Sequence, residues 1–470
     1  MIIRAKGEER AVIAQKEIDI WLGRWAKIFM AYSSTNSNPF CFAHPTLFRS
    51  LTEGGSPVAE RVLAPLAEIL PKLQTTRECP ELPDEDWLTI GVLRVLHEVK
   101  SGRGFLQEVG AHLPNCPDFN HFFATLRSER RLAFCREAET LLSAALRARL
   151  PDTLAAEEEL ADFDIYAGDG HWHGAAAHDH RPFAESPKPA CGHFFALDLR
   201  RGLLHHITAA DQVEREHEHD MRALQRQTIE ALRRGARKGR KVFYVWDRAG
   251  INFRAWKKWK QRGGIYFLSR EKDNMTLRVI KVLPWEASDA RNAGVQSDEQ
   301  CQSSCGELLR RVVYEDPVSL TTHVFLTNEM TLPPGLIAEL GRRRWNIEKV
   351  FDELKNKLGE TKAWATSAPA KSMQAVFFCL THQLLLAFEH LLDEEHGIRP
   401  DAELARRAQR IENEIQMATQ NNRAFPSLRA ATLRLTQRTV KLLRWLRSSL
   451  SRQAPWLDLI ALLRHSYASG

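Results

Sequence analysis

Three carboxylates in separate parts of the chain are the residues best suited to do chemistry together. Glu348 lies in the segment Arg344-Trp-Asn-Ile-Glu-Lys-Val-Phe-Asp-Glu-Leu-Lys355, which we expect to form one helix. Arg344 and Lys355 stand four residues before and seven residues after Glu348, so the three side chains share one helix face. Asp169 and Asp247 each end a strand-like run. Carboxylates from separate elements are what a divalent-metal site for phosphoryl transfer requires.

The chemistry that such a trio supports is phosphodiester cleavage. Two divalent ions about 3.5–4 Å apart can neutralise a phosphate, activate a nucleophile and stabilise the leaving oxygen. Mg²⁺ (or Mn²⁺) prefers oxygen ligands and keeps several waters, so few carboxylates suffice. We expect Asp169 to bridge two ions, and Asp247 and Glu348 to hold one ion each. Arg344 and Lys355 are expected to contact the phosphates that flank the scissile bond.

The elements that must position these residues alternate between strands and helices. The runs with strand-like alternation or a short apolar core cover residues 162–169, 193–199, 203–208, 241–246, 265–268 and 323–327. Helix-period spacing covers residues 214–234 and 252–262, and Pro333-Pro334 opens the helix that carries Glu348. Strand candidates at 277–283 and 308–313 flank a polar loop at 287–306. This order predicts an α/β fold with a mixed sheet that has helices on its faces.

Five regions follow from the same pass along the chain. The first and last are helical, and the last is rich in basic residues. The predicted boundaries are 1–155 (helical), 156–275 (first part of the core), 276–317 (β-rich insertion), 318–390 (second part of the core) and 391–470 (basic, helical).

Composition limits the class of protein further. The chain has 470 residues, 44% of them hydrophobic, which predicts several domains with a substantial core. The net charge is +7, and residues 421–470 carry nine Lys or Arg against Asp458 alone, so an acidic partner such as nucleic acid is expected. The N-terminus lacks the apolar run of a signal peptide. The apolar stretch Met373–Phe388 is too short and too polar to span a bilayer, so we expect it to form a buried helix. The eight cysteines show no framework, which indicates reduced thiols.

These motifs resemble those of the DDE transposases of bacterial insertion sequences, in the subgroup with a Tyr-x2-Arg-x3-Glu-x6-Lys helix. Arg344, Glu348 and Lys355 match that helix, while Gly341 stands where the family has tyrosine. The remaining matches, which bring the resemblance to residues 160–370, are Tyr166-Ala-Gly-Asp169-Gly, Asp247-Arg-Ala-Gly, Phe267-Leu-Ser-Arg270 and Leu326-Thr-Asn328.

The resemblance implies a ribonuclease-H-like core and a bacterial cytoplasmic enzyme that cuts and joins DNA at the ends of its own insertion sequence. It implies Mg²⁺ or Mn²⁺ as cofactor, double-stranded DNA as partner and a homodimer in the DNA complex. The family's tyrosine assists phosphate binding, so that contact must be absent here or come from elsewhere. Candidate DNA contacts besides Arg344 and Lys355 are Arg248, Arg270, His171 and, in the insertion, Trp285. A catalytically inactive DNA-binding derivative and a nuclease without transposition are the rival hypotheses.

Some groups leave alternatives open. His171, His173, His178 and His180 could bind zinc, but no paired-cysteine motif accompanies them, so contact with DNA or loop capping is favoured. A basic run at 233–241 and a helix at 254–262 that interleaves cations with two tryptophans predict either a DNA-binding surface or an ordinary solvated face over buried rings.

Overall fold

The computed structural model describes residues 57–74, 82–96, 101–105, 119–176, 191–211, 218–430, 440–452 and 454–465. His178 and His180 of the histidine cluster lie outside these residues, as do the basic residues Arg434 and Arg438 of the C-terminal region.

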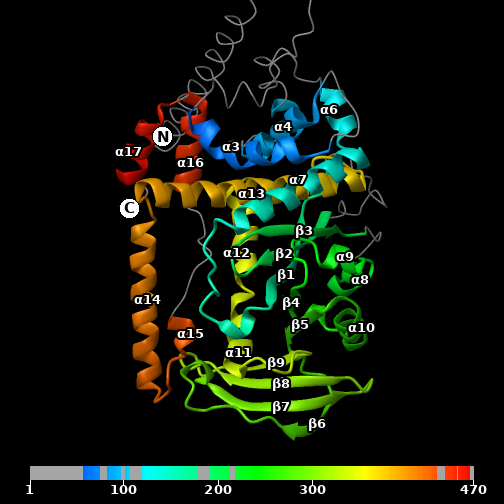
Figure 1. Ribbon diagram of the computed structural model, residues 1–470, viewed down its shortest axis with the longest axis vertical. Coiled ribbons are helices and arrows are strands. Elements are labelled where there is room, and N and C mark those ends of the chain that lie inside the picture. Colours follow the sequence, from blue (N-terminus) through cyan, green and yellow to red (C-terminus); the bar gives the residue numbers. More distant parts are fainter. Residues whose placement is uncertain are drawn as a thin grey trace, which may run out of the picture.

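A single mixed sheet runs through the described part of the chain (Figure 1). Its strand order is β3-β2-β1-β4-β5-β9-β8-β7-β6. The strands are β1 (Phe163–His173), β2 (Cys191–Asp198), β3 (Leu204–Ala209), β4 (Lys241–Val245), β5 (Ile265–Arg270), β6 (Leu277–Val282), β7 (Val295–Ser303), β8 (Leu308–Glu315) and β9 (Thr322–Thr327). The first three strands form an antiparallel meander, and β4 and β5 extend it in parallel from β1. This confirms the mixed α/β fold predicted from the order of the elements.

Helices lie on both faces of the sheet and at both ends of the described chain (Figure 1). Those before the sheet are α3 (Pro57–Ile69), α4 (Asp84–Leu96), α6 (Phe119–Thr125) and α7 (Glu129–Arg147). Those between its strands are α8 (Asp220–Gln225), α9 (Ile229–Leu232) and α10 (Phe253–Gly263). Those after it are α11 (Pro334–Arg343), α12 (Asn346–Asp352), α13 (Ala368–His396), α14 (Asp401–Gln420), α15 (Ser427–Ala430), α16 (Val440–Arg452) and α17 (Trp456–Leu463).

Alternating side chains of the central strands supply two separate cores. Ile165 and Ala167 of β1 join the large core beneath α7 and α11–α13, whereas Tyr166 between them joins a second core with Trp256 and Trp259 of α10. This is the period-2 geometry of a strand buried on both faces. Both faces of the sheet are therefore fixed by packing, and so are the side chains that emerge at the ends of its strands.

The long helix α13 joins the N-terminal helices to the sheet, and Figure 1 shows it running between them. Ser367 caps its start by accepting a hydrogen bond from the Ala370 amide, and Gly397 ends it with a positive φ of 62°. Among the described residues it alone is long and apolar enough to be a candidate membrane span, but 72% of its most apolar window is buried within the structure. The prediction that Met373–Phe388 is a buried helix is confirmed.

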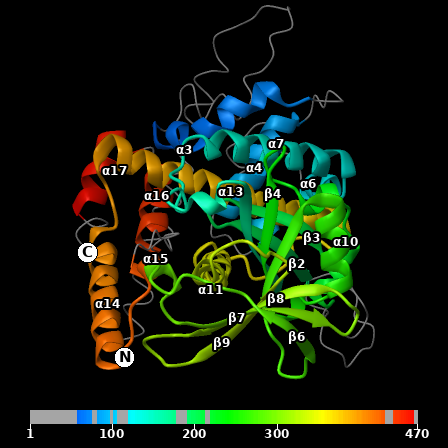
Figure 2. The ribbon, with the colours of Figure 1, turned by 60° about the horizontal axis from the view of Figure 1, so that its bottom comes forward.

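The sequence-based prediction was wrong at three elements. The polar loop at 287–306 contains β7, which pairs with both β6 and β8, because alternate residues of this polar strand, Cys301 and Ser303 among them, are buried. Figure 2 shows β6–β9 as the end of the sheet that comes forward beside α11. The helix expected at 214–234 is two short helices, α8 and α9, each with its own N-cap, His219 and Thr228.

The third difference concerns the segment with the arginine–glutamate–lysine signature. It is not one helix: α11 ends at Arg343, α12 begins at Asn346, and a π-helical turn, η5 (Glu353–Lys357), follows. Arg344 and Trp345 form the joint between α11 and α12. A π-helical turn changes the rotation per residue, so Lys355 does not hold the α-helical offset of seven from Glu348.

Candidate active site

Asp169 lies within β1 rather than at its end, because the strand continues to His173. It pairs in register with Phe195 of β2, and its side chain is 19% exposed. Its Oδ1 accepts a hydrogen bond from the Gly170 amide at 2.8 Å. The expectation that Asp169 ends the strand was wrong, although the parallel pairing of β1 with β4 does stop at Ala167, two residues earlier. The Asp169 carboxylate therefore emerges where β4 has already ended.

Asp247 follows β4 and caps the short 3-10 turn η3 (Arg248–Gly250). Its Oδ1 accepts a hydrogen bond from the Ala249 amide at 2.7 Å, and its carbonyl accepts one from the Ser269 hydroxyl at 2.7 Å. Asp247 thus acts as a helix cap through one carboxylate oxygen, a role that is compatible with metal binding by the other.

The indole of Trp246, the residue before Asp247, is held in a close-packed position. The ring is buried, and its Nε1 donates to Asp220 Oδ2 at 2.7 Å. A Cβ at either Gly168 or Gly250 would collide with it. Two glycines are therefore needed so that the backbone on both sides can approach the indole closely.

Arg344 joins the first strand to the signature segment. Its guanidinium donates to Asp169 Oδ2 at 3.0 Å and to Glu348 Oε1 at 2.7 Å. The predicted offset of four between Arg344 and Glu348 gives a direct ion pair, and the same arginine reaches a carboxylate 175 residues away in the chain. The structure thereby brings Asp169 and Glu348 to one cation.

Electrostatic interactions connect the remaining acidic groups. Burial raises the pKa of Asp169 to about 7, the neighbouring charge of Arg344 works against that rise, and the charges of Asp247 and Asp220 add to it. Burial and the charge of Asp247 likewise raise the pKa of Asp220. Asp169, Asp247 and Asp220 therefore interact with one another, with Glu348 tied to Asp169 through Arg344.

Asp220 was missed at the sequence level. It is the first residue of α8, after His219, whose ring accepts from the Met221 amide. An aspartate in a first helical turn is common for reasons of helix stability alone. The only sequence signal was its position between two strand-end aspartates, which does not predict that it reaches them.

The predicted DNA contacts occupy different positions around the acidic groups. Arg248 is half exposed and 3.5 Å from Asp273. Lys355 is exposed in η5, and its charge lowers the pKa of His171. His171 is nearly buried, with its ring 4.8 Å from that of Phe351, and burial lowers its pKa to about 4. Trp285 is partly exposed in the connection after β6, and no contact ties it to the acidic groups.

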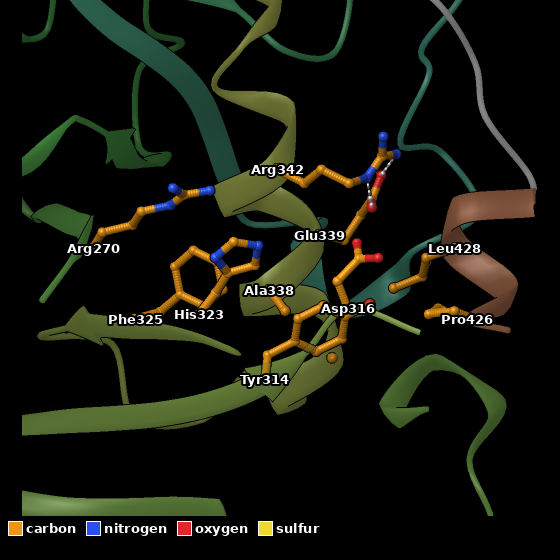
Figure 3. Close-up of a pocket in the computed structure, with 11 residues that line it drawn as sticks. Arg270, Tyr314, Asp316, His323, Phe325, Ala338, Glu339, Arg342, Pro426 and Leu428 are labelled. Carbon is orange, nitrogen blue, oxygen red and sulfur yellow. Dashed lines mark hydrogen bonds and ion pairs between the residues drawn. The ribbon is translucent and has the colours of Figure 1, made fainter. Parts of the chain in front are cut away.

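Arg270 ends β5 and lines a pocket with His323, Phe325 and Arg342 (Figure 3). Burial and the positive charges of Arg344 and Arg248 lower its pKa. Among the described residues no carboxylate pairs with it, whereas Arg342, on the other side of the pocket, is paired with Glu339 at 2.8 Å. Arg270 is thus a cation held among other cations.

The same pocket explains the glycine in the signature. A Cβ at Gly341 would lie inside van der Waals contact with the Phe325 ring. The space beside this position is occupied by Phe325, so a tyrosine at 341 would fit only if that ring moved. The His323 ring lies 6.2 Å from the Phe325 ring between centroids, and Arg270 of β5 is paired in register with Phe325 of β9.

Other polar residues near the site have structural partners. Asp164, which also lies in β1, is buried and paired with Arg237 at 2.6 Å. Asp198 of β2 pairs with Arg147. Within the basic run, Arg233 donates to the Gly263 and Arg240 carbonyls. Several arginines of this run therefore help to hold the fold together.

The two tryptophans of α10 are also structural. The rings of Trp256 and Trp259 stack on Phe267 at centroid distances of 5.5 and 5.1 Å and are almost fully buried. The two rings are therefore not available to stack on bases, whereas contact of the basic face of this helix with DNA stays a prediction.

The sheet is an antiparallel meander that two parallel strands extend, and acidic side chains lie on β1, just after β4 and on a facing helix. This is the class of fold expected of a ribonuclease-H-like nucleic-acid enzyme. Residues 188–382, less than half of the chain, match the family model of the transposase DDE domain, and this match supports a DDE transposase. This match spans Asp247 and Glu348 but begins after Asp169. No curated protein matches the chain. The family acts on DNA and generally uses a divalent metal.

Proposed function

We propose that the protein is a metal-dependent DNA nuclease and strand-transferase that acts on the ends of its own insertion sequence. Asp169, Asp247 and Glu348 are the proposed catalytic carboxylates. The observation that carries the proposal is the Arg344 guanidinium, which holds Asp169 and Glu348 together beside Asp247. An ion pair that only stabilised the fold would not need the further carboxylates of Asp247 and Asp220 nearby.

The donor set fits a hard divalent cation such as Mg²⁺ or Mn²⁺. Only oxygen donors converge here, and burial, together with the charges of Asp247 and Asp220, raises the pKa of Asp169 to about 7 against the effect of Arg344. Asp169, Asp247 and Glu348 would hold the metal, as one ion or as two. When bound, it would supply charge neutralisation at the phosphate and activation of water or of a 3′-hydroxyl.

The chain's own groups account for the rest of the site. Arg344 pairs with both Asp169 and Glu348 and so holds the two carboxylates near each other. Ser269 holds the Asp247 carbonyl, and the Trp246 indole donates to the carboxylate of Asp220. Preorganised groups of this kind lower a reaction barrier because they need no rearrangement during the reaction.

The cations beside the carboxylates give the site its polynucleotide specificity. We propose that Arg270 and His323 provide the phosphate contact that tyrosine provides in the family, because the Phe325 ring fills the space at Gly341. Arg248 and Lys355 would contact phosphates further along the strand. His171 would stay neutral near neutral pH and donate or accept a hydrogen bond, since its pKa is about 4.

The helical regions 1–155 and 391–470 are proposed to bind the element ends and a second protomer. Trp285 is proposed to contact a base from the β-rich segment 276–317. These assignments rest on the family resemblance and on the excess of basic residues after residue 421.

The experiment uses the purified full-length protein, Mg²⁺ or Mn²⁺, and DNA that carries the element's own ends. Nicking at the element boundary and joined products are expected. Asp169→Asn, Asp247→Asn and Glu348→Gln should each remove both products and retain DNA binding. Glu394→Gln serves as the control carboxylate, because this residue is 66% exposed on α13 and lies outside the proposed site.

The outcomes separate the proposal from its two rivals. Binding without cleavage by the wild-type protein indicates an inactive derivative. Cleavage without any joined product indicates a nuclease that does not transpose. Full cleavage by any one of the three carboxylate variants removes that residue from the catalytic set.

A further inference from the structure

A second group of ligand-type side chains lies further along β1 and β2. One ring nitrogen each of His173 and His193 and the Sγ of Cys191 lie within 4.8 Å of one another. None of these three residues has a part in the proposed reaction. The proposed catalytic carboxylates are absent from the group, and its donors are nitrogen and sulfur instead of oxygen.

Sheet register explains why these residues meet. His173 of β1 pairs directly with Cys191 of β2, and His193 lies two residues further along β2. Residues two apart on a strand point to the same face, so the thiol and both imidazoles lie on one side of the sheet. This register could not be foreseen from the sequence cluster, where His173 is grouped with His178 and His180.

The three side chains are buried. Cys191, His193 and His173 are 1%, 0% and 7% exposed. Neither ring nitrogen of His173 has a hydrogen-bond partner in the described structure. A buried polar group without a partner is destabilising, so a native structure that keeps one normally has a use for it.

The geometry is already close to that of a tetrahedral site. Cys191 Sγ and His193 Nε2 are 3.3 Å apart. Bond lengths of about 2.3 Å to sulfur and about 2.0 Å to nitrogen put two such ligands about 3.5 Å apart on a tetrahedron. His173 stacks on His193 with ring centroids 5.2 Å apart, so a small rotation of its imidazole brings it into range.

A further histidine orients one of the ligands. His193 Nδ1 lies 3.2 Å from His206 Nε2 of β3. When Nδ1 carries the proton and donates it to His206, the Nε2 lone pair of His193 faces Cys191. Histidine ligands in metal sites commonly have their second nitrogen fixed in this way.

We propose that His173, Cys191 and His193 form a structural Zn²⁺ site, with water or another small ligand in the fourth position. Thiolate and imidazole together favour zinc over Mg²⁺. Lys371 is a nearby cation, and the negative thiolate would offset its repulsion of the metal.

The consequence for the protein is a cross-link between β1 and β2 four residues beyond Asp169. Beyond this point β1 is fastened to the segment after the signature helix by the Gly174 amide, which donates to the Thr361 carbonyl at 2.9 Å. Zinc would in addition attach this end of β1 to β2. The site is independent of the proposed catalysis, since it needs neither DNA nor the acidic residues.

The test measures metal in the full-length protein after dialysis against metal-free buffer. Addition of Zn²⁺ should give about one tightly held equivalent, and Co²⁺ in its place should give a sulfur-to-cobalt charge-transfer band with tetrahedral d–d bands. Cys191→Ser should remove the charge-transfer band, and His173→Ala should weaken zinc binding at least tenfold. Cys301→Ser is the matched control, because Cys301 is an equally buried thiol in β7.

A second control separates this site from the acidic one. Asp169→Asn should retain the zinc and the cobalt spectrum, whereas a spectrum that disappears in this variant would assign the bound metal to the carboxylates and overturn the proposal. A wild-type protein without the charge-transfer band overturns it as well, even where the Cys191 and His173 variants fail to fold. Equal loss of the band in Cys301→Ser would have the same meaning.

Discussion

Gly168 offers a direct test of how the fold supports the candidate active site. It precedes Asp169 in β1, and a methyl group at this position would overlap the six-membered ring of Trp246, where ordinary contacts lie at 3.4–4 Å. The ring cannot easily withdraw, because it is 1% exposed, lies against Gly250 and donates to Asp220. Gly168→Ala must therefore shift either the indole or the backbone of β1.

The magnitude follows from the cost of overpacking a core. One added methyl group in a well-packed site costs about 1–3 kcal/mol. Alanine restricts the unfolded chain and recovers about 0.4–1 kcal/mol of this. We expect a net loss of about 1–2 kcal/mol in the free energy of unfolding, together with weaker metal binding, because Asp169 and Asp247 are the residues next to Gly168 and Trp246.

Urea denaturation followed by circular dichroism measures the first effect and calorimetric titration with Mn²⁺ the second. Gly170→Ala is the matched control on the same strand, since a Cβ there would lie 3.1 Å from its nearest neighbour, Phe194, and needs only a small adjustment. Trp246→Leu makes room for the methyl group, so Gly168→Ala should cost less in that background. An unchanged urea midpoint for Gly168→Ala, or an equal cost with and without Trp246, would refute this account of the site.

The remaining predictions concern the electrostatics of the acidic groups. Because its pKa is about 7, Asp169 must lose a proton to bind a cation, so Mn²⁺ affinity should be about tenfold weaker at pH 6 than at pH 8. Calorimetry in two buffers measures the proton release. An affinity that does not change with pH contradicts the burial argument. In the metal-free protein the same raised pKa means that the unfolded carboxyl ionises first, so the free energy of unfolding should fall as pH rises from about 4 to 7. Asp220→Asn removes a charge that raises the pKa of Asp169, so the metal-binding profile should move to lower pH; lost affinity at all pH values would instead make Asp220 a ligand. Arg344→Gln should weaken DNA binding and reduce its salt dependence by about one phosphate contact, as measured by fluorescence anisotropy against salt; unchanged salt dependence would restrict Arg344 to the two carboxylates.

The local sequence pattern predicted most strands and helices of the core well, but it did not predict where a helix is interrupted. The strands at 241–246 and 265–268 and the helix at 252–262 are close to β4, β5 and α10, because apolar alternation, the Asn252 cap and the left-handed Gly264 are all local features. The break at Arg344–Trp345 and the division between α8 and α9 have no such signal. The alternating burial of β7 depends on pairing with β6 and β8, which a window of its own polar residues does not contain.

By itself the sequence determined the chemical types present, the offset of four that pairs Arg344 with Glu348, and the strand and helix order of the core. Only the tertiary structure decided which charges meet. It brought Asp220 to the acidic residues and Arg344 to Asp169, and it placed Cys191 beside His173. It also paired Arg237 of the basic run with Asp164, 73 residues away in the chain. The reason is that periodicity is a property of neighbouring residues, whereas the pairing of distant side chains depends on sheet register and on how helices close over the two faces.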